Sequence, residues 1–371
     1  MLGAILPYFS LWLAARDLSP SQIGIVLGVF GAMRIALPVA WGWVADRWDC
    51  RLALIRFATL AALVSFIAVP LAGDFRGILL AVMLFSLFWN ATMPQFEALT
   101  LNHLARSGGD YSQVRLWGSV GFVIAVLLLG WLFEHAGIEG LPWVIVLLIA
   151  GMLAVILRTP PSGAHPEPTP PGTSLWRVLR QPMVMALLVV CFLSQLSFAP
   201  YYGFFSLYLE LYGYSRSQTG LLWAFGVVIE IWVFLYTGAL IRRHGARGMM
   251  LLAMASTVLR WALLPMTIQW LPGLLLLQAL HLSSFGIYHA CAIHYIYRCF
   301  PGRLQGRGQA LYVSASFGLG GAVGAWLSGQ VWEAWSPDAL YVGAAAAAAL
   351  GWLVAWRYLA EPASSTAVRA N

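Results

Sequence analysis

The chain contains Phe9-Ser10-Leu11-Trp12-Leu13 followed by Ser19, Ser21, Gln22 and Gly24, and repeats this pattern as Phe205-Ser206-Leu207-Tyr208-Leu209 followed by Ser215, Ser217, Gln218 and Gly220. One offset of 196 residues relates both ends of the two stretches (205 − 9 = 196 and 220 − 24 = 196). The same register relates Gly42 to Gly238 and Arg51 to Arg247. Matches at this many positions in one register indicate two copies of one unit.

The composition places both copies in a lipid bilayer. Of the 371 residues, 61% are hydrophobic and 9% are charged, whereas soluble globular proteins carry about 25% charged residues. This excludes a soluble enzyme, a disordered protein and a disulfide-stapled scaffold. The apolar runs are about 20 residues long, the length at which an α-helix crosses the hydrocarbon core. The sequence therefore predicts an all-α polytopic membrane protein.

The basic residues and cysteines point to no further class of protein. The 21 basic residues are all Arg and stand singly between apolar runs, which does not indicate a nucleic-acid partner. The four cysteines (Cys50, Cys191, Cys291 and Cys299) lack the spacing of a metal site.

The apolar runs predict twelve helices in two groups of six. The first run, Leu2 to Ala15, is about 21 Å long as a helix, against a hydrocarbon core of about 30 Å. We therefore expect the natural start of the chain to lie upstream, with the first helix truncated here. The predicted helices are 2–15, 21–45, 52–71, 77–101, 113–135, 141–158, 182–212, 218–241, 248–268, 273–298, 309–335 and 339–358.

Arg residues predict which loops are cytoplasmic. Fifteen Arg residues lie in or beside the loops 46–51, 102–112, 158–181, 242–247 and 299–308 and the C-terminal tail, whereas the opposite loops hold only Arg16, Arg76 and Arg216. The positive-inside rule places the first set and both termini in the cytoplasm. Six spans separate the two copies, so the copies share one orientation, as in transporters with parallel repeats. The expected domains are a six-helix bundle at 1–158, a Pro-rich linker without packed structure at 159–181, a second bundle at 182–358 and a tail at 359–371.

The loop after the second helix carries Gly42, Asp46, Arg47 and Arg51. This spacing matches the cytoplasmic loop signature of the major facilitator superfamily, G-x-x-x-D-R-x-x-x-R. One interpretation is a latch that locks the cytoplasmic end. The other is positive-inside topology alone.

Ionisable side chains inside the spans are costly and are functional hypotheses by default. The offset of 196 maps Arg34 onto Glu230 (34 + 196 = 230), so opposite charges lie at equivalent depth and are expected to pair. One interpretation is a set of fixed ion pairs. The other is proton coupling, because a carboxylate in a low-dielectric site can take up a proton near neutral pH and a movable Arg can switch it. The residues predicted for coupling are Glu230, Arg260, His281 and Arg34. Glu230 is the candidate proton carrier, and Glu97 stays open as the alternative.

Glu97 and Arg115 form a second group of ionisable residues inside the predicted spans. Pro94 is expected to interrupt the helix that carries Glu97, and a broken helix is tolerated where it lines a cavity. Arg115 beside Trp117 offers bidentate carboxylate recognition and a stacking face, although with 18 Trp in the chain a lipid-facing role for Trp117 stays open. The candidate substrate-binding residues are Arg115, Glu97, Trp117, Tyr8, Tyr201, Tyr202, His281 and His289.

The chain resembles the phenylpropionate permease family of the major facilitator superfamily over nearly its whole length. The resemblance implies the twelve-helix fold of two six-helix bundles, and proton-coupled import of an aromatic acid such as 3-phenylpropionate, with Arg115 holding the carboxylate. The motifs that carry it are Leu6-Pro7-Tyr8-Phe9-Ser10-Leu11-Trp12-Leu13, Asp110-Tyr111, Val114-Arg115-Leu116-Trp117-Gly118-Ser119-Val120, Tyr201-Tyr202-Gly203-Phe204, Gly226-Val227-Val228 with Glu230, Leu259-Arg260-Trp261, Leu280-His281 and His289.

A more distant resemblance is to the lactose–proton symporter. It places Glu97 and Arg115 at substrate-binding positions, and Glu230, Arg260 and His281 at the polar positions of helices 8, 9 and 10. The proton-carrying Glu of that transporter, three residues after the helix 10 His, is Ser284 here. The resemblance therefore does not supply the proton site.

We therefore expect a proton-coupled symporter in a bacterial-type inner membrane, which works as a monomer by alternating access. Its expected partners are a small organic solute, the proton and the lipid bilayer, with no metal and no cofactor besides the coupling proton. The same fold with a nucleoside or oligosaccharide as cargo stays open. An intramembrane enzyme lacks a Ser/His/Asp or HExxH pattern to support it, and a non-transporting sensor is a further alternative.

Overall fold

The computed structural model describes residues 1–48, 50–107, 111–160, 175–300 and 304–361. For several residues within these ranges, Asp46 and Arg115 among them, only the backbone is described. The described ranges contain helices and no strand. The N-terminal half comprises α1 (Leu2–Ala15), α2 (Pro20–Ala32), α3 (Leu37–Arg47), α4 (Arg51–Leu71), α5 (Phe75–Ser107), α6 (Tyr111–Ala136) and α7 (Leu141–Arg158).

The C-terminal half includes two π-helical segments, η1 and η2. Its elements are α8 (Leu175–Leu179), α9 (Pro182–Leu211), α10 (Arg216–His244), α11 (Ala246–Thr267), α12 (Leu271–Ala279), η1 (Leu282–Ile287), α13 (Tyr288–Cys299), α14 (Leu304–Val313), η2 (Ser314–Gly320), α15 (Gly321–Ala334) and α16 (Pro337–Tyr358).

The twelve predicted helices are all present. Ten stretches of the described chain are long and apolar enough to cross a membrane, and α10 makes an eleventh when its two parts, Arg216–Val233 and Tyr236–His244, count as one span. The twelfth is α1, an apolar helix of 14 residues. The all-α membrane fold is thus confirmed.

The repeated residues determine where the second helix of each half begins. At the start of α2, the Ser19 hydroxyl accepts a hydrogen bond from Gln22 N (3.4 Å), and Gln22 Oε1 accepts one from Ser19 N (3.0 Å). Ser215 and Gln218 form the same reciprocal cap on α10, at 3.3 and 2.8 Å. Each cap satisfies two N–H groups that lack a partner within the helix.

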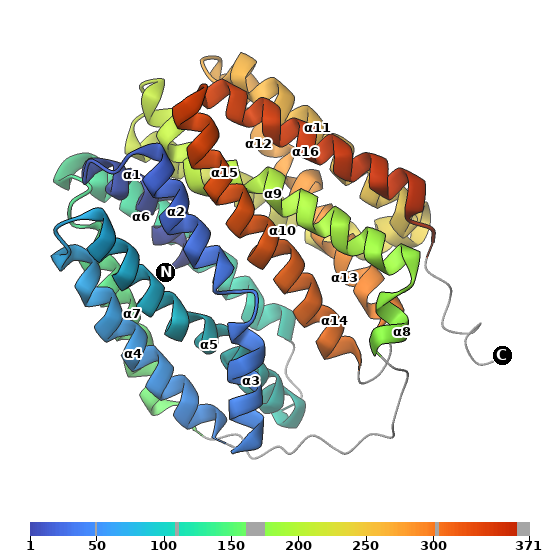
Figure 1. The fold of residues 1–371 in the computed structure, drawn as a ribbon, viewed down its shortest axis with the longest axis horizontal. Coiled ribbons are helices and arrows are strands. Elements are labelled where there is room, and N and C mark those ends of the chain that lie inside the picture. Colours follow the sequence, from blue (N-terminus) through green and yellow to red (C-terminus); the bar gives the residue numbers. More distant parts are fainter. Residues whose placement is uncertain (49, 108–110, 161–174, 301–303, 362–371) are drawn as a thin grey trace.

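The two halves form two bundles, each with its own core. In Figure 1 the blue-to-green helices α1–α7 make one bundle, and α9–α16 make the other. Phe66 and Phe133 are buried in the first core, and Trp261 and Tyr288 in the second. The bundles meet through α2 against α15, α6 against α10, and α1 against α9.

Glycines allow this close contact between the halves. A Cβ added to Gly24 in α2 would lie 2.7 Å from the carbonyl oxygen of Ala325 in α15. At the equivalent position in the other half, a Cβ on Gly220 in α10 would collide with the carbonyl oxygen of Val126 in α6. The repeat therefore carries glycine where each half touches the other.

The halves are held together at the end where α2 and α10 begin. There Ser21 N donates to Glu333 Oε2 at 2.9 Å, and Ser217 N donates to Glu134 Oε2 at 2.8 Å. Toward the opposite end, α3 packs against α4 and α5 of its own half, and Figure 1 shows it diverging from α14.

Two helices differ from expectation in where they break. The helix through Pro94 was expected to be interrupted, but α5 is continuous from Phe75 to Ser107. Membrane helices tolerate proline because neighbouring groups and local adjustments satisfy the freed carbonyl. The run predicted at 21–45 instead breaks between Ala32 and Leu37. Pro38 lacks the N–H that would bond to the carbonyl of Arg34, so helical hydrogen bonding stops there.

The expectation of an unpacked linker is wrong for its last residues. Leu175–Leu179 forms α8, and Val178 is buried in the core of the C-terminal half. Apolar side chains in this segment explain the packing, since burial removes them from water. Residues 161–174 of the linker and 362–371 of the tail lie outside the described residues.

Candidate functional site: a cavity between the halves and a buried polar network

A cavity of about 300 Å³ lies between the two halves. Four aromatic side chains contribute to its wall: Phe30, Tyr202, Phe285 and Phe317. Phe285 lies in η1 and Phe317 in η2. Wide-turn π segments are frequent at functional sites because they displace side chains from the regular helical path. Both halves therefore contribute rings to one apolar chamber.

Besides the Tyr202 hydroxyl, three polar side chains interrupt this apolar wall: Ser10, Arg34 and Gln195. Arg34 lies in the break between α2 and α3, and its guanidinium carbon is 4.9 Å from the centre of the Phe30 ring. Within the described part of the chain this guanidinium forms no ion pair with a carboxylate. Ser10 Oγ and Gln195 Nε2 are buried and have no hydrogen-bond partner among the described residues.

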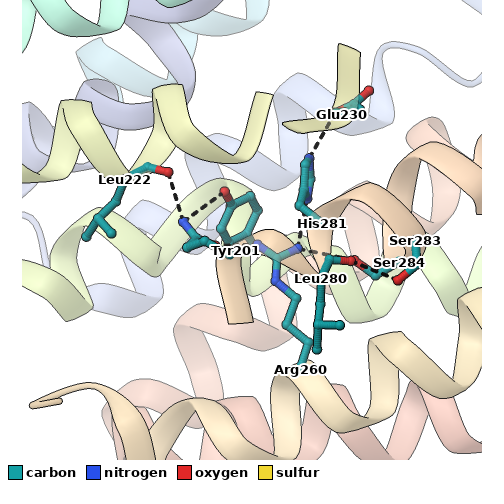
Figure 2. A network of polar contacts seen from close by, with 9 residues as sticks. Tyr201, Leu222, Glu230, Arg260, Leu280, His281, Ser283 and Ser284 are labelled. Atoms are coloured by element: carbon teal, nitrogen blue, oxygen red, sulfur yellow. Dashed lines mark hydrogen bonds and ion pairs between the residues drawn. The ribbon is translucent and has the colours of Figure 1, made fainter. Parts of the chain in front are cut away.

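A network of polar side chains centred on Arg260 lies inside the C-terminal half (Figure 2). Arg260 is 1% exposed, and its guanidinium carbon lies 4.4 Å from the ring centre of Tyr201 and 4.6 Å from that of Trp261. Its Nη2 donates to Gln278 Oε1 at 2.5 Å, and its Nη1 lies 2.8 Å from His281 Nδ1. Among the described residues, hydrogen-bond acceptors and ring faces thus stabilise the buried cation, and no carboxylate contacts it directly.

The partners of His281 determine where its proton lies. A guanidinium can only donate hydrogen bonds, so Nδ1, which faces Arg260, must accept. The ring proton therefore lies on Nε2, which is 3.1 Å from Glu230 Oε2 and donates to it. Figure 2 shows the resulting chain of Arg260, His281 and Glu230.

The expected pairing of Arg34 with Glu230 does not form among the described residues. Glu230 is bonded within its own half by His281, and Arg34 is held over Phe30 by the helix break. Each half therefore arranges its charge separately.

His281 and His289, two of the candidate substrate-binding residues, contact the same aromatic ring. The Phe285 ring stacks on His281 at 5.3 Å and on His289 at 5.9 Å. Phe285 contributes to the cavity wall, whereas neither histidine does. His289 Nδ1 lies 2.9 Å from the Tyr312 hydroxyl.

The remaining candidate residues lie in different surroundings. Of the three candidate tyrosines, Tyr8, Tyr201 and Tyr202, only Tyr202 lines the cavity. Tyr201 packs on Arg260, and the buried Tyr8 hydroxyl donates to the carbonyl of Val126 at 2.6 Å. Trp117 is 74% exposed on α6 and Glu97 is exposed on α5, both apart from the cavity wall. The side chain of Arg115 lies outside the described residues.

The predicted latch is described only in part. The side chain of Asp46 lies outside the described residues, Arg47 is exposed, and the Gly42 position faces Gln95 of α5. In the second half, Arg247 Nε donates to the carbonyl of Leu359 and its Nη2 to that of Trp356, both at 2.7 Å. Arg247 therefore satisfies carbonyls at the end of α16, within one half.

Sequence reasoning missed the uncharged polar residues of both sites. Gln278 accepts from Arg260 and also donates to the carbonyl of Leu222 at 3.2 Å. Ser10 and Gln195 line the cavity. A search for amides and hydroxyls inside apolar spans finds all three, since such groups are expected to hydrogen-bond across helices.

Comparisons with known proteins agree with this architecture. The sequence is 34% identical over 326 residues to the "Probable 3-phenylpropionic acid transporter" of Escherichia coli (strain K12), covering 85% of this chain and 83% of that protein. It is 28% identical over 344 residues to the "Maltose permease" of Geobacillus stearothermophilus, covering 92% and 86%.

The solved structures show the same fold. A mutant of the nucleoside transporter NupG matches with a TM-score of 0.84 at 14% identity, covering 96% of each chain. The family profile of the MFS_1 like family matches residues 1–342. The chain therefore belongs to the MFS_1 like family and is a secondary transporter of the major facilitator superfamily.

Proposed function

We propose that this protein is a proton-coupled symporter that imports a small aromatic carboxylic acid, of the 3-phenylpropionate kind, by alternating access of its two halves. The observation that carries the substrate class is the cavity wall, in which one guanidinium stands among four aromatic rings. Such a wall suits a molecule with one negative group and an apolar body.

The scarcity of polar groups argues against the other cargoes. An oligosaccharide or nucleoside presents many hydroxyls, and each hydroxyl buried without a partner costs about 1–3 kcal/mol. The cavity offers few polar groups: the side chains of Ser10, Arg34 and Gln195 and the hydroxyl of Tyr202. Its volume of about 300 Å³ suits a single-ring acid. The name of the 34%-identical relative supports the same class.

Glu230 is the group we propose to carry the proton. If His281 took up a proton at Nδ1, a second N–H would point at the Arg260 guanidinium, and the 2.8 Å contact would be lost. Glu230 can be protonated while its carbonyl oxygen still accepts from His281 Nε2. Neutralising Glu230 leaves Arg260 as the remaining charge of the network, which releases Arg260 and favours reorientation of the loaded carrier.

The contacts between the halves support an inward-facing state. The contacts made by Glu134 and Glu333 close the end that the Arg distribution assigns to the periplasm. The cavity would then open toward the cytoplasm, where both termini would lie. In this proposal the protein acts as a monomer in a bacterial-type inner membrane.

Uptake into proteoliposomes tests the proposal. A pH gradient should drive accumulation of labelled 3-phenylpropionate above equilibrium, and Glu230→Gln should abolish that accumulation. Glu139→Gln, which changes an exposed loop carboxylate, is the matched control and should leave uptake unchanged. Uptake that is indifferent to the pH gradient would exclude proton coupling. Uptake of maltose or a nucleoside in place of the acid would exclude the substrate class.

The same assay separates the alternatives of other classes. The family consists of transporters and not of enzymes, so the intramembrane-enzyme alternative has no support from relatives. A non-transporting sensor would give no uptake of any compound in the panel.

A further inference from the structure

Three polar side chains of the cavity wall share one property: the described residues leave a polar or charged group on each without a hydrogen bond or ion pair. Ser10 and Gln195 are each 2% exposed, yet Ser10 Oγ and Gln195 Nε2 have no hydrogen-bond partner among the described residues. Arg34 contacts the Phe30 ring and no carboxylate of the described chain. Buried polar groups are normally hydrogen-bonded, and an exception needs an explanation. All three line one cavity, which points to a common ligand.

The internal repeat supplies a control for this observation. Ser206 is the equivalent of Ser10 (10 + 196 = 206), and its hydroxyl accepts from Trp223 Nε1 at 3.1 Å. Glu230 is the equivalent of Arg34, and it is bonded to His281 at 3.1 Å. The two C-terminal copies have partners within the protein, whereas among the described residues Ser10 Oγ has no hydrogen-bond partner and Arg34 has no carboxylate partner. A purely structural role would predict the same in both halves.

The backbone around Arg34 also favours a ligand. Discontinuous membrane helices expose backbone and side chains to transported solutes. Arg34 lies in the break between α2 and α3, where its N–H bonds to the carbonyl of Gly31 at 2.9 Å. The adjacent carbonyl of Ile35 accepts from Ser314 Oγ of η2 at 2.7 Å. This hydrogen bond attaches the break to the other half and so keeps Arg34 at the cavity.

We infer that Arg34, assisted by Ser10 Oγ and Gln195 Nε2, binds the carboxylate of the transported acid. The guanidinium provides two parallel donors and the positive charge, and the amide and hydroxyl provide further donors. The rings of Phe30, Tyr202 and Phe285 then surround the apolar body. This assignment rests on the proposed function and differs from the family resemblance, which gives the carboxylate to Arg115. The anion would be held from the N-terminal half by Arg34 and Ser10, and from the C-terminal half by Gln195.

Binding of an acid and its neutral amide tests the assignment. The purified full chain in detergent would be titrated with 3-phenylpropionate and with 3-phenylpropanamide, which has the same shape without the charge. Arg34→Gln should weaken acid binding by about 10- to 100-fold, the usual effect of losing a charged hydrogen bond. Amide binding should change by less than about twofold, because only the charged contact is lost. The affinity of Arg34→Lys for the acid should lie between those of the unchanged protein and Arg34→Gln. Lysine keeps the positive charge but lacks the two parallel donors of the guanidinium.

Matched variants separate binding from folding. Ser10→Ala should weaken acid binding by about fivefold, the effect of one neutral hydrogen bond, and Ser206→Ala, its equivalent in the repeat, should leave it unchanged. Arg180→Gln removes another guanidinium that lies over a ring, that of Trp176 at 5.6 Å, and should also have no effect. Retained amide binding shows that each variant is folded.

Three outcomes would overturn the assignment. The first is an Arg34→Gln variant that binds the acid as tightly as the unchanged protein. The second is an equal loss of acid and amide binding in both Arg34 variants, which would indicate a structural role. The third is a loss of acid binding in the Arg115→Gln variant without any loss in the Arg34→Gln variant. If the unchanged protein binds no aromatic acid, the proposed function itself fails, and this result is distinct from the other three.

Discussion

At the scale of single residues, Arg260 shows how a charge is accommodated inside the membrane span. It is enclosed by the rings of Tyr201 and Trp261 and hydrogen-bonded by Gln278 and His281. Aromatic faces and neutral acceptors each compensate part of the desolvation of a cation. Among the described residues His281 links Glu230 to Arg260, so a change of charge on the carboxylate would reach Arg260 indirectly.

Gln278 is the residue on which this arrangement depends. Replacing it by Leu removes the acceptor at 2.5 Å from Arg260 and the donor to the carbonyl of Leu222. We expect the free energy of unfolding to fall by about 2–4 kcal/mol, because a buried charged donor and a backbone carbonyl both lose a partner. Thermal unfolding of the purified protein in detergent measures the effect. The exposed Gln269 provides the control, and a Gln269→Leu variant that is destabilised equally would contradict the explanation.

At the scale of elements, two carboxylates hold helix starts of the opposite half. Glu333 of α15 accepts from Ser21 N at the start of α2, and Glu134 of α6 accepts from Ser217 N at the start of α10. The N-terminal end of a helix carries free N–H groups and a partial positive charge, so a carboxylate there is stabilising. Both contacts join the halves at one end, and both must break when that end opens.

The double variant Glu134→Gln with Glu333→Gln should therefore favour the opposite orientation of the halves. Each substitution removes the negative charge from a helix start, while the amide oxygen can still accept the hydrogen bond, so the closed orientation loses electrostatic stabilisation. Spin labels at the exposed positions Glu139 and Trp335 report the separation of the halves at this end. A distance distribution identical to that of the labelled parent would show that the caps do not control the orientation.

The glycine contacts give an independent test at the same scale. Gly220→Leu would place a side chain against the carbonyl of Val126, and the neighbouring backbone cannot yield as a flexible side chain could. We expect the same end to be forced apart, with loss of uptake in a protein that is still folded. Gly343 of α16 has nothing within 4 Å of an added Cβ, so Gly343→Leu is the control. Normal uptake by Gly220→Leu would show that this contact opens without cost.

Particular elements explain which features sequence alone could predict. The repeat of Ser19 and Gln22 at Ser215 and Gln218 predicted two equivalent halves because the same caps start equivalent helices. The equivalence of Arg34 and Glu230 was predictable from the register. The partner of Arg34 was not, since the break before Leu37 directs the side chain to Phe30. The π segments η1 and η2, which carry Phe285 and Phe317, have no period in sequence that distinguishes them from α-helix.

At the scale of the whole molecule, the repeat has produced halves with different tasks. At equivalent positions of the repeat, the N-terminal half carries the cation Arg34 and the C-terminal half carries the carboxylate Glu230. In the arrangement we propose, the N-terminal half neutralises the substrate and the C-terminal half neutralises the proton. Reorientation of the loaded carrier then follows when Arg34 holds the anion and Glu230 holds the proton, the state in which Arg260 is released.

This division predicts opposite defects for two variants in a counterflow assay, in which labelled acid exchanges against unlabelled acid without a pH gradient. Glu230→Gln resembles the permanently protonated carrier, so it should exchange 3-phenylpropionate at a rate within about threefold of the unchanged protein, because exchange requires no proton release. It should fail to accumulate the acid against a gradient. Arg34→Gln should lose exchange and accumulation together, since it lacks the group that holds the anion. If Glu230→Gln lost exchange as well, the carboxylate would be part of substrate binding, and the two halves would not be divided as proposed.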